Sequence, residues 1–409
     1  MNREKYDLST DVAILGAGPA GVSTALFLAR AGIEHIIFDQ TTFPREKICG
    51  DALSGKVVDV LKKIDPVLRD KLEEAQGKFI PSRGAIFGAP NGQRLELPFQ
   101  SRWGETVHAS GFIGKRLHFD NLLVNMLHDQ VTRKEFGAKV TDVHRVAGGV
   151  EIRFKKNGEE RCCLAKMVVG AEGDRSLVAR KFAGFSVEPE HYSAGVRTYF
   201  KNITGFHEQN YIELYFFKEL LPGYFWLFPL PGNLANVGIG MPSQLVRRGK
   251  LNLKAMMLRI IKENPEMKER FKNTVMVDRI KGWRLPLGTK KRKLSGDRFL
   301  LVGDAASLID PFTGEGVGNA LTSGMVAADI IKSALARHDF SAKFLSVYDA
   351  ALYDQLWDEL QLSGKLLKLV KKSWLVNLVV NKANKSKTLR ETIGAMFEDL
   401  DMRDKLRSP

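Results

Sequence analysis

The feature that most constrains the fold of this sequence is a glycine pattern near its start. Gly16, Gly18 and Gly21 stand between a short apolar strand, expected over 11–15, and an apolar helix, expected over 19–31. In a unit of this kind the first glycine permits a tight turn and the second lets a pyrophosphate approach the backbone, while the third allows close packing of helix on strand. The pattern therefore predicts a dinucleotide site on a Rossmann-like parallel sheet.

An acidic residue stands where such a site binds a ribose. Asp39 follows the next expected strand, 35–38, and comes eighteen residues after Gly21. A carboxylate here accepts a hydrogen bond from a ribose 2′-hydroxyl and disfavours a 2′-phosphate, so the site suits FAD or NAD rather than NADP. The helix N-terminus favours the pyrophosphate. The residues expected to bind the dinucleotide are Gly16, Ala17, Gly18, Pro19, Ala20, Gly21 and Asp39.

A second motif distinguishes between FAD and NAD. A buried strand is expected over 299–302, and Gly303 and Asp304 follow it. Ligands bind at the carboxyl ends of parallel strands, where Asp304 can accept a hydrogen bond from a ribityl hydroxyl, a group that NAD lacks. A glycine-rich loop, 310–318, then leads into a helix expected over 317–336, and its backbone N–H groups suit the negative edge of a reduced flavin. The sequence thus predicts FAD.

The remaining patterns add further helices and strands. Helical periodicity is expected over 54–74, 117–127 and 251–271, whereas 139–163 and 191–241 alternate as antiparallel strands do. We expect an α/β chain, α+β overall, with an FAD-binding Rossmann-like domain built on a parallel sheet, a substrate domain with a mixed or antiparallel sheet, and a helical C-terminal region. The expected bounds are 1–76, 102–180 and 275–340 for the FAD-binding domain, 77–101 and 181–274 for the substrate domain, and 341–409 for the helical region.

Cysteine content and charge narrow the compartment and the partners. The chain has three cysteines and no apolar run long enough to cross a bilayer. Its polar start runs straight into a strand and gives no sign of a signal peptide, so we expect a reduced, cytoplasmic location. The net charge of +15 implies attraction to an anionic partner, such as nucleic acid, an acidic cofactor or a membrane surface.

Several other chemistries lack their motifs. The sequence contains neither an H-E-x-x-H or C-x-x-C pattern that would suggest a metal nor a G-x-S-x-G pattern that would suggest a serine hydrolase. It also contains no second G-x-G-x-x-G motif, so we expect no stable NADPH domain. The flavin would then be reduced by an external donor, either NAD(P)H in transient contact or an electron-transfer protein.

Longer motifs carry a resemblance to known flavoproteins. The glycine turn, the run 170–176 (GAEGDRS) and Gly303-Asp304 are similar to the para-hydroxybenzoate-hydroxylase-like flavoproteins. Within that class, 44–54 (PREKICGDALS) and 222–229 (PGYFWLFP), followed by 236–240 (NVGIG), resemble the geranylgeranyl reductase family. The resemblance covers about residues 7–340.

The resemblance implies roles for residues around bound FAD. Asp39 would bind the adenosine ribose, Arg116 would reach the pyrophosphate, and Val140 would contact the adenine through its backbone. Asp304 would hold the ribityl chain, and the loop after it would face the isoalloxazine edge. Outside the glycine turn, the implied cofactor-binding residues are Asp39, Arg45, Cys49, Gly50, Ala52, Arg116, Val140, Gly173, Asp304, Pro311, Gly314, Gly316 and Val317.

Cys49 has two interpretations. Most unpaired cysteines are small buried hydrophobic residues. The resemblance instead places Cys49 beside the flavin, where it would tune the cofactor or assist proton delivery. We therefore take it as the candidate catalytic residue.

The aromatic run 211–228 also has two interpretations. Aromatic residues favour strands and fill sheet cores, and an apolar pocket for a small molecule has a similar composition. Alternation along a strand permits one face for each role. We expect Tyr215, Tyr224, Trp226 and Phe228 to contribute to an apolar substrate pocket over the flavin.

The stretch 362–381 combines apolar and basic residues. Leu366, Val370, Trp374 and Leu378 would share one stripe of a helix, and lysines another. Such a helix either packs on the protein body with a solvated lysine face or lies on a membrane as a peripheral contact. The expected location is cytoplasmic, either free or peripheral to the inner face of the membrane.

Three functions fit these patterns. The first is the reduction of isolated C=C bonds in a prenyl chain on a lipid or quinone, with hydride from reduced flavin and a proton from a nearby acid. The second is a class A flavin monooxygenase that hydroxylates or epoxidises an apolar or aromatic substrate. The third is a non-enzymatic nucleic-acid or membrane-binding protein, which the net charge suggests but for which the FAD motifs would have no use. We expect an FAD-dependent oxidoreductase with a small apolar, isoprenoid substrate and no nucleic-acid partner.

Overall fold

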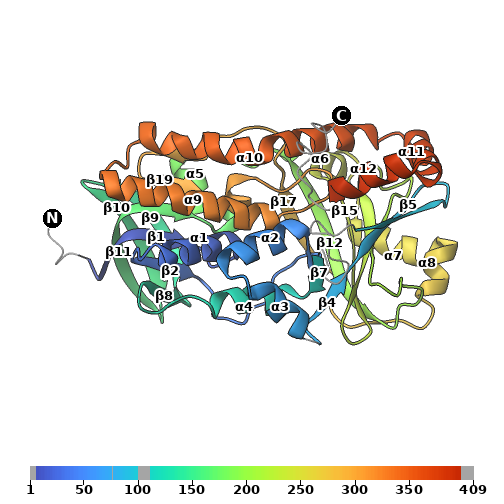
Figure 1. Cartoon of the computed structure of the whole chain (residues 1–409), viewed down its shortest axis with the longest axis horizontal. Helices are drawn as coiled ribbons and strands as arrows, with labels where there is room; N and C mark the ends of the chain where they lie inside the picture. Colours follow the sequence, from blue (N-terminus) through green and yellow to red (C-terminus); the bar gives the residue numbers. More distant parts are fainter. Residues whose placement is uncertain (1–5, 76, 100–110, 398–409) are drawn as a thin grey trace.

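The computed structural model describes residues 6–75, 77–99 and 111–397, apart from the side chains of 395–397. The domain boundaries expected at 76 and at 101–102 fall outside these residues. Within them, two large sheets lie toward opposite ends of the longest axis, and a third, small sheet completes the strands (Figure 1). The expected combination of a parallel sheet, further sheets and a helical C-terminal region is confirmed.

The first sheet contains the parallel strands that the glycine pattern predicted. Its strands are β1 (Leu8–Leu15), β2 (His35–Asp39), β8 (Thr132–Phe136), β9 (Lys139–Val146), β10 (Gly149–Lys156), β11 (Glu159–Gly170), β18 (Ser295–Gly296) and β19 (Phe299–Leu301). The order is β18-β19-β11-β1-β2-β8, and β1 lies parallel to both β2 and β11. Residues 12–15 of β1 are fully buried, as expected for a parallel strand that is covered on both faces.

The second sheet is mostly antiparallel. Its strands are β5 (Gly84–Gly88), β6 (Arg94–Pro98), β12 (Tyr192–Lys201), β13 (Ile212–Tyr215), β14 (Tyr224–Leu230), β15 (Leu234–Pro242), β16 (Val275–Met276) and β17 (Lys281–Pro286), and the small sheet holds β3 (Ala52–Leu53), β4 (Phe79–Ser82) and β7 (Gly111–Gly114). Strand β13 pairs with β5 in parallel. Strands β16 and β17, from the range 275–340, both pair with β12 in this second sheet. The division into domains stays a prediction.

The helices follow the expected periodicity but are shorter where proline interrupts them. They are α1 (Pro19–Arg30), α2 (Gly55–Ile64), α3 (Leu68–Glu74), α4 (Arg116–Val124), α5 (Leu177–Phe182), α6 (Ser243–Arg248), α7 (Leu253–Glu263), α8 (Pro265–Arg270), α9 (Val317–Arg337), α10 (Ala342–Leu369), α11 (Ser373–Lys385) and α12 (Lys387–Phe397). The stretches 54–74 and 251–271 each form two helices, because Pro66 and Pro265 cannot continue a helix from the preceding turn.

The C-terminal stretch differs from the single amphipathic helix that we expected. Helix α10 ends at Leu369 and α11 begins at Ser373, so residues 366–378 do not share one face of a single helix. Instead Val376 and Val380 of α11 pack into the body beside β6. In the described residues no helix is both long and apolar enough to span a membrane. In Figure 1, α10 extends lengthwise from the first sheet toward the second, where α11 and α12 lie.

We expect Gly21→Ala to destabilise the fold. A Cβ atom at Gly21 would lie 1.9 Å from the carbonyl oxygen of Gly16, so the helix or the turn would have to move. Overpacking of this kind costs about 1–3 kcal/mol, measured as a loss of the free energy of unfolding of the FAD-free protein in urea. Gly364→Ala is the matched control, because a Cβ atom inside α10 at this position meets no atom within 4 Å. Equal effects of the two substitutions would contradict the packing argument.

Candidate cofactor and substrate cavity

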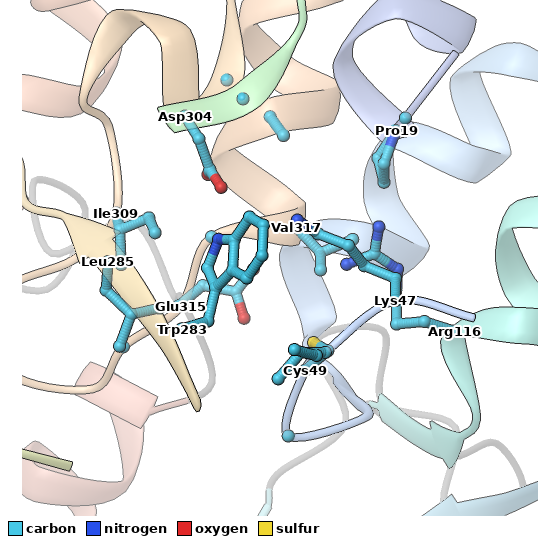
Figure 2. A pocket seen from close by; sticks show the side chains of 18 of the residues that line it. Pro19, Lys47, Cys49, Arg116, Trp283, Leu285, Asp304, Ile309, Glu315 and Val317 are labelled. Carbon is cyan, nitrogen blue, oxygen red and sulfur yellow. The ribbon is translucent and has the colours of Figure 1, made fainter. Parts of the chain in front are cut away.

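One cavity of about 1040 Å³ is lined by residues of both large sheets. Asp39 reaches it from the end of β2, and Asp304 reaches it from the loop after β19. Trp226 of β14 and Trp283 of β17 line it from the second sheet. Figure 2 shows Trp283 and Asp304 facing this space. The cavity thus lies at the carboxyl ends of the parallel strands, where open α/β sheets bind ligands.

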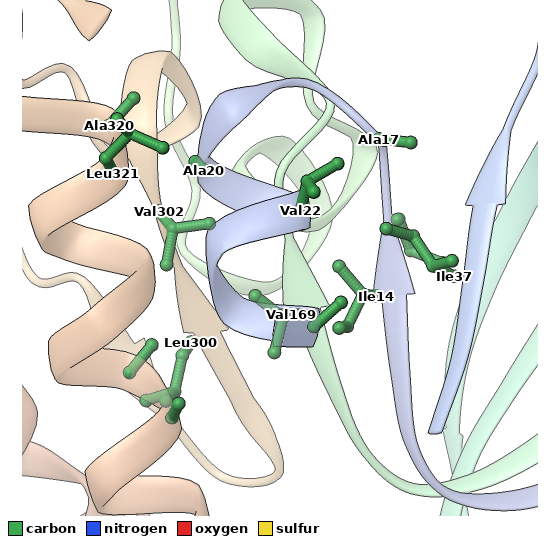
Figure 3. Packing of buried hydrophobic residues seen from close by; sticks show 14 of the residues in the cluster. Ile14, Ala17, Ala20, Val22, Ile37, Val169, Leu300, Val302, Ala320 and Leu321 are labelled. Carbon is green, nitrogen blue, oxygen red and sulfur yellow. The ribbon is translucent and has the colours of Figure 1, made fainter. Parts of the chain in front are cut away.

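The glycine turn forms one end of the cavity and fits a pyrophosphate. Gly16 has a φ of +103°, which permits the tight turn after β1. Gly18 is the N-cap of α1 and supplies no side-chain cap, and the first turn of the helix carries no acidic residue. The first turn of α1 therefore has no carboxylate of its own, and its N–H groups and positive dipole end can attract a phosphate. Behind the turn, Ala20 faces Ala320 of α9 (Figure 3).

Asp39 is held in place beside the glycine turn. Its Oδ2 atom accepts a hydrogen bond from the Ala17 N–H at 2.9 Å. Its Oδ1 atom accepts from the N–H of Thr41 at 2.9 Å and from the Thr41 hydroxyl at 2.7 Å. A carboxylate has about four acceptor positions, so three bonds fix its orientation and leave capacity for a ribose hydroxyl.

Arg116 lies in a buried ion-pair cluster next to the cavity. Its Nε and Nη2 atoms donate to the two carboxylate oxygens of Asp120 at 2.6 and 3.0 Å. Arg45 lies 3.3 Å from the same carboxylate. Although burial acts against its charge, Asp120 raises the pKa of Arg116 above its ordinary value. The Arg116 guanidinium therefore stays cationic, and a guanidinium beside the cavity suits a bound pyrophosphate.

Asp304 faces the cavity together with two cations. Burial raises the pKa of the Asp304 carboxyl, while the charges of Lys47 and Arg116 act to lower it. Burial also disfavours the charged form of Lys47 and so lowers its pKa, and the negative charge of Asp304 opposes this effect. Figure 2 shows Lys47 and Asp304 on different sides of the space that Trp283 enters. Polar groups from distant segments of the chain therefore converge on one part of the cavity.

The loop before α9 is held in a fixed shape. The Oδ1 atom of buried Asp310 accepts hydrogen bonds from the N–H groups of Phe312 and Thr313 at 2.9 and 2.7 Å. The Tyr224 hydroxyl donates to the Thr313 carbonyl at 2.6 Å. Gly314 then turns the chain with a φ of +76°. This rigid turn presents the start of α9 to the cavity, as a flavin-binding loop requires.

Cys49 lines the cavity beside Arg116. Burial raises the pKa of its thiol above the ordinary value, and the Arg116 charge only partly opposes this effect. At neutral pH the group is therefore a thiol rather than a thiolate. Such a group can hold and donate a proton but is a poor nucleophile.

The aromatic wall of the cavity comes from one face of β14. Tyr224, Trp226 and Phe228 alternate along the strand and line the cavity. Phe225 and Leu227, on the other face, are fully buried in the core of the second sheet. One face of the strand therefore packs in the sheet core and the other lines the cavity, and a substrate role for the lining face stays a prediction.

Tyr215 is the exception among the expected substrate residues. It lies outside the cavity, where its hydroxyl donates to Glu213 at 2.6 Å and accepts from Arg270 at 2.8 Å. Its neighbour Leu214 lines the cavity instead. The register of β13 against β5 and β14 turns Tyr215 to the opposite face of the sheet.

The cavity brings together most of the residues that the sequence singled out. Ala17 and Gly21 do not line it: the first is bonded to Asp39, and the second packs behind the turn. The residues of the sequence prediction that line the cavity are Gly16, Gly18, Pro19, Ala20, Asp39, Arg45, Cys49, Gly50, Ala52, Arg116, Val140, Gly173, Tyr224, Trp226, Phe228, Asp304, Pro311, Gly314, Gly316 and Val317.

Sequence reasoning missed Lys47 and Trp283. The Lys47 ammonium lies 4.3 Å from the centre of the Trp283 ring, and the Arg175 guanidinium carbon lies 5.2 Å from it. A cation above an indole ring at these distances is attracted to it. Lys47 lies within the 44–54 motif, so the resemblance carried by that motif could have indicated it. Trp283 lies in a short strand with no motif around it, and only the fold places it here.

The fold and the cavity define a flavin-binding oxidoreductase, and comparison with known proteins places the chain in a family. The protein-family model described as "FAD binding domain" matches residues 9–338, so the chain belongs to that family. It is an FAD-dependent oxidoreductase.

The chain is also similar to named relatives and shares its fold with solved structures. The chain is 28% identical to the menaquinone reductase of Mycobacterium tuberculosis over 80% of its length and 78% of that protein. It is 26% identical to the digeranylgeranylglycerophospholipid reductase of Methanococcus vannielii, over 96% and 93% of the two chains. A geranylgeranyl bacteriochlorophyll reductase-like protein of Thermoplasma acidophilum shares the fold, with a TM-score of 0.80, 22% identity, and coverage of 97% and 98% of the two chains. The flavin-dependent brominase Bmp2 also shares the fold, with a TM-score of 0.75 at 20% identity over 95% and 94%.

We expect Asp304→Ala to weaken FAD binding. A hydrogen bond to a charged group contributes about 1.5–3 kcal/mol, so the Kd for FAD should rise by roughly 10-fold to 150-fold. Flavin absorbance retained after gel filtration and titration of the FAD-free protein both measure this change. Asp297→Ala is the control, because that aspartate is exposed just before β19 and lies outside the cavity. An unchanged Kd in Asp304→Ala would contradict a role in cofactor binding.

Proposed function

We propose that this protein reduces isolated C=C bonds in the prenyl chain of a lipid or quinone. The observation that carries the proposal is one cavity that is lined both by the glycine turn and Asp304 and by the aromatic wall of β14. The names of the relatives support it, because they act on menaquinone and on a digeranylgeranyl lipid. A long apolar substrate fits the wall formed by Tyr224, Trp226 and Phe228.

The residues of the chain would divide the work between cofactor and substrate. Bound FAD would supply hydride once it is reduced. Asp39, Arg116 and Asp304 would hold its ribose, pyrophosphate and ribityl groups, in line with their places around the cavity. The aromatic wall would exclude water, which an unactivated double bond requires. Cys49 is our candidate proton donor, because burial keeps its thiol protonated.

The electron donor would come from outside the chain. The sequence has one dinucleotide glycine motif, and the cavity residues that match it are those expected for FAD. We therefore propose that NAD(P)H in transient contact, or an electron-transfer protein, reduces the flavin. Stopped-flow reduction with NADH and NADPH separates the two: bleaching of the flavin absorbance by neither would leave the electron-transfer protein.

An anaerobic product assay tests the reductase directly. We expect dithionite-reduced enzyme, mixed without oxygen with a geranylgeranyl lipid, to yield a product heavier by two hydrogen atoms in mass spectrometry. Cys49→Ala protein that takes up electrons but forms little product would support proton delivery by the thiol. A strict need for oxygen, with the gain of one oxygen atom, would instead establish the alternative, a flavin monooxygenase.

A peripheral membrane contact would bring such a substrate to the cavity. Leu367 of α10 lines the cavity, and only two residues later Leu369 is 52% exposed. Trp374, at the start of α11, is 60% exposed. No acidic residue lies between Glu359 and Glu391. Seven lysines occupy this interval: Lys365, Lys368, Lys371, Lys372, Lys382, Lys385 and Lys387. We propose that this basic surface with exposed apolar residues contacts an anionic bilayer.

Vesicle sedimentation tests the membrane contact. We expect the protein to sediment with phosphatidylglycerol-containing vesicles and much less with phosphatidylcholine alone. Lys371→Glu/Lys372→Glu should weaken this binding at least about 30-fold, since each lysine near an anionic surface contributes about 1 kcal/mol. Lys254→Glu/Lys262→Glu is the matched control, because these two lysines are exposed on α7 and lie outside the cavity. Equal losses in both proteins would point to net charge alone and overturn the assignment.

A further inference from the structure

A buried asparagine joins the aromatic wall to the loop that carries Cys49. Asn236 lies on β15 and is 0% exposed. The indole N–H of Trp226 donates to its Oδ1 atom at 2.9 Å. Its Nδ2 atom donates to the Cys49 carbonyl at 2.7 Å and to the Asp51 carboxylate at 2.8 Å. One amide side chain thus uses both of its donors and its acceptor, with partners in two parts of the cavity.

The chemistry of these partners allows one orientation of the amide. An indole N–H can only donate, so the atom that it meets must be the amide oxygen. A backbone carbonyl and a carboxylate can only accept, so the NH₂ group must face Cys49 and Asp51. A flipped amide would place its oxygen against two acceptors and its NH₂ group against a donor. The Trp226 ring and the loop that carries Cys49 must therefore both be in place for every polar atom of the Asn236 amide to have a hydrogen-bond partner.

Asp51 anchors the loop side of this connection. It is 0% exposed and has a φ of +72°, a left-handed conformation that is costly for a residue with a Cβ atom. Besides Asn236, its carboxylate accepts from the Tyr199 hydroxyl at 2.7 Å and from the Arg116 N–H at 3.1 Å. The Arg197 guanidinium carbon lies 4.3 Å from the centre of the Tyr199 ring. These contacts hold a backbone shape that the chain would not adopt alone.

We propose that Asn236 is a positioning residue that couples the aromatic wall to the loop of residues 49–51, with Trp226 acting on this loop through Asn236. The Trp226 ring lines the cavity, while its N–H group fixes the amide that holds the Cys49 carbonyl and Asp51. If the ring moves, the Asn236 oxygen loses its buried partner and the loop loses part of its support. Coupling between two sites is reciprocal, so an ordered loop also stabilises the position of the ring. An apolar ligand on the wall and FAD beside the loop would then favour each other's binding.

The test compares variants through Cys49 reactivity and FAD affinity. In a Cys162→Ser background, the rate of Cys49 alkylation by iodoacetamide and the Kd for FAD are measured for Trp226→Phe, which keeps an aromatic ring but removes the N–H group. We expect alkylation about 5-fold to 10-fold faster and a Kd raised by a similar factor, because a buried polar atom left unpaired costs about 1–3 kcal/mol. Trp357→Phe, the same substitution on α10, is the control and should change neither quantity.

The double variant shows whether Trp226 acts through Asn236. We expect Trp226→Phe/Asn236→Leu to react no faster than Asn236→Leu alone, because both substitutions break one chain of contacts. Effects that simply multiply, or Trp226→Phe values equal to those of the control, would overturn the proposal. If Asn236→Leu does not fold in circular dichroism, Asn236→Ala replaces it, since it also removes the amide that joins Trp226 to Cys49 and Asp51. None of these measurements uses a prenyl substrate or turnover. A negative result would therefore contradict the coupling through Asn236 without bearing on the proposed reductase activity.

Discussion

The close approach of backbone segments around α1 is the constraint on which the cofactor end of the cavity depends. A Cβ atom at Gly21 would lie 1.9 Å from the Gly16 oxygen, and one at Gly324 would lie 2.4 Å from the Ala20 oxygen. Helix α1 is therefore pressed against the turn after β1 on one side and against α9 on the other. Because α9 begins at the loop after Asp304, this contact fixes the distance between the two halves of the site. Backbone atoms set the spacing there.

The cavity changes character from one end to the other. Buried ionisable groups surround the cofactor end, where Arg116 and Asp120 form an ion pair and Asp310 shapes the loop before α9. The other end is lined by the rings of β14. A buried charge is costly unless it is paired or hydrogen-bonded. The polar groups of the cavity are therefore held in fixed positions by their partners, next to apolar residues, before any ligand binds. Such a lining suits an anionic dinucleotide and, in the function we propose, an apolar chain beside it.

Local patterns in the sequence were enough to predict the cofactor end. The helix from Pro19 and the strand from His35 appear within one residue of their expected bounds, since each combines strong periodicity with a glycine turn. Long-range pairing decided the rest. Alternation along β13 divided its residues between two faces, but only the register with β5 shows that Leu214 rather than Tyr215 faces the cavity. Trp283 meets Lys47 because β17 pairs with β12, a contact that no local pattern contains.

The order of strands in the first sheet also affects when the site can form during synthesis. Gly170 at the end of β11 pairs with Leu15 on one side and with Leu301 on the other. The two cofactor motifs lie beyond these strand ends and are separated by more than 280 residues of sequence. Chains are made from the N-terminus, and domains fold as their parts become available. The glycine turn therefore emerges from the ribosome long before its partner loop. FAD can meet a complete site only after α9 has been made, which makes cofactor capture a late event in the life of the nascent chain.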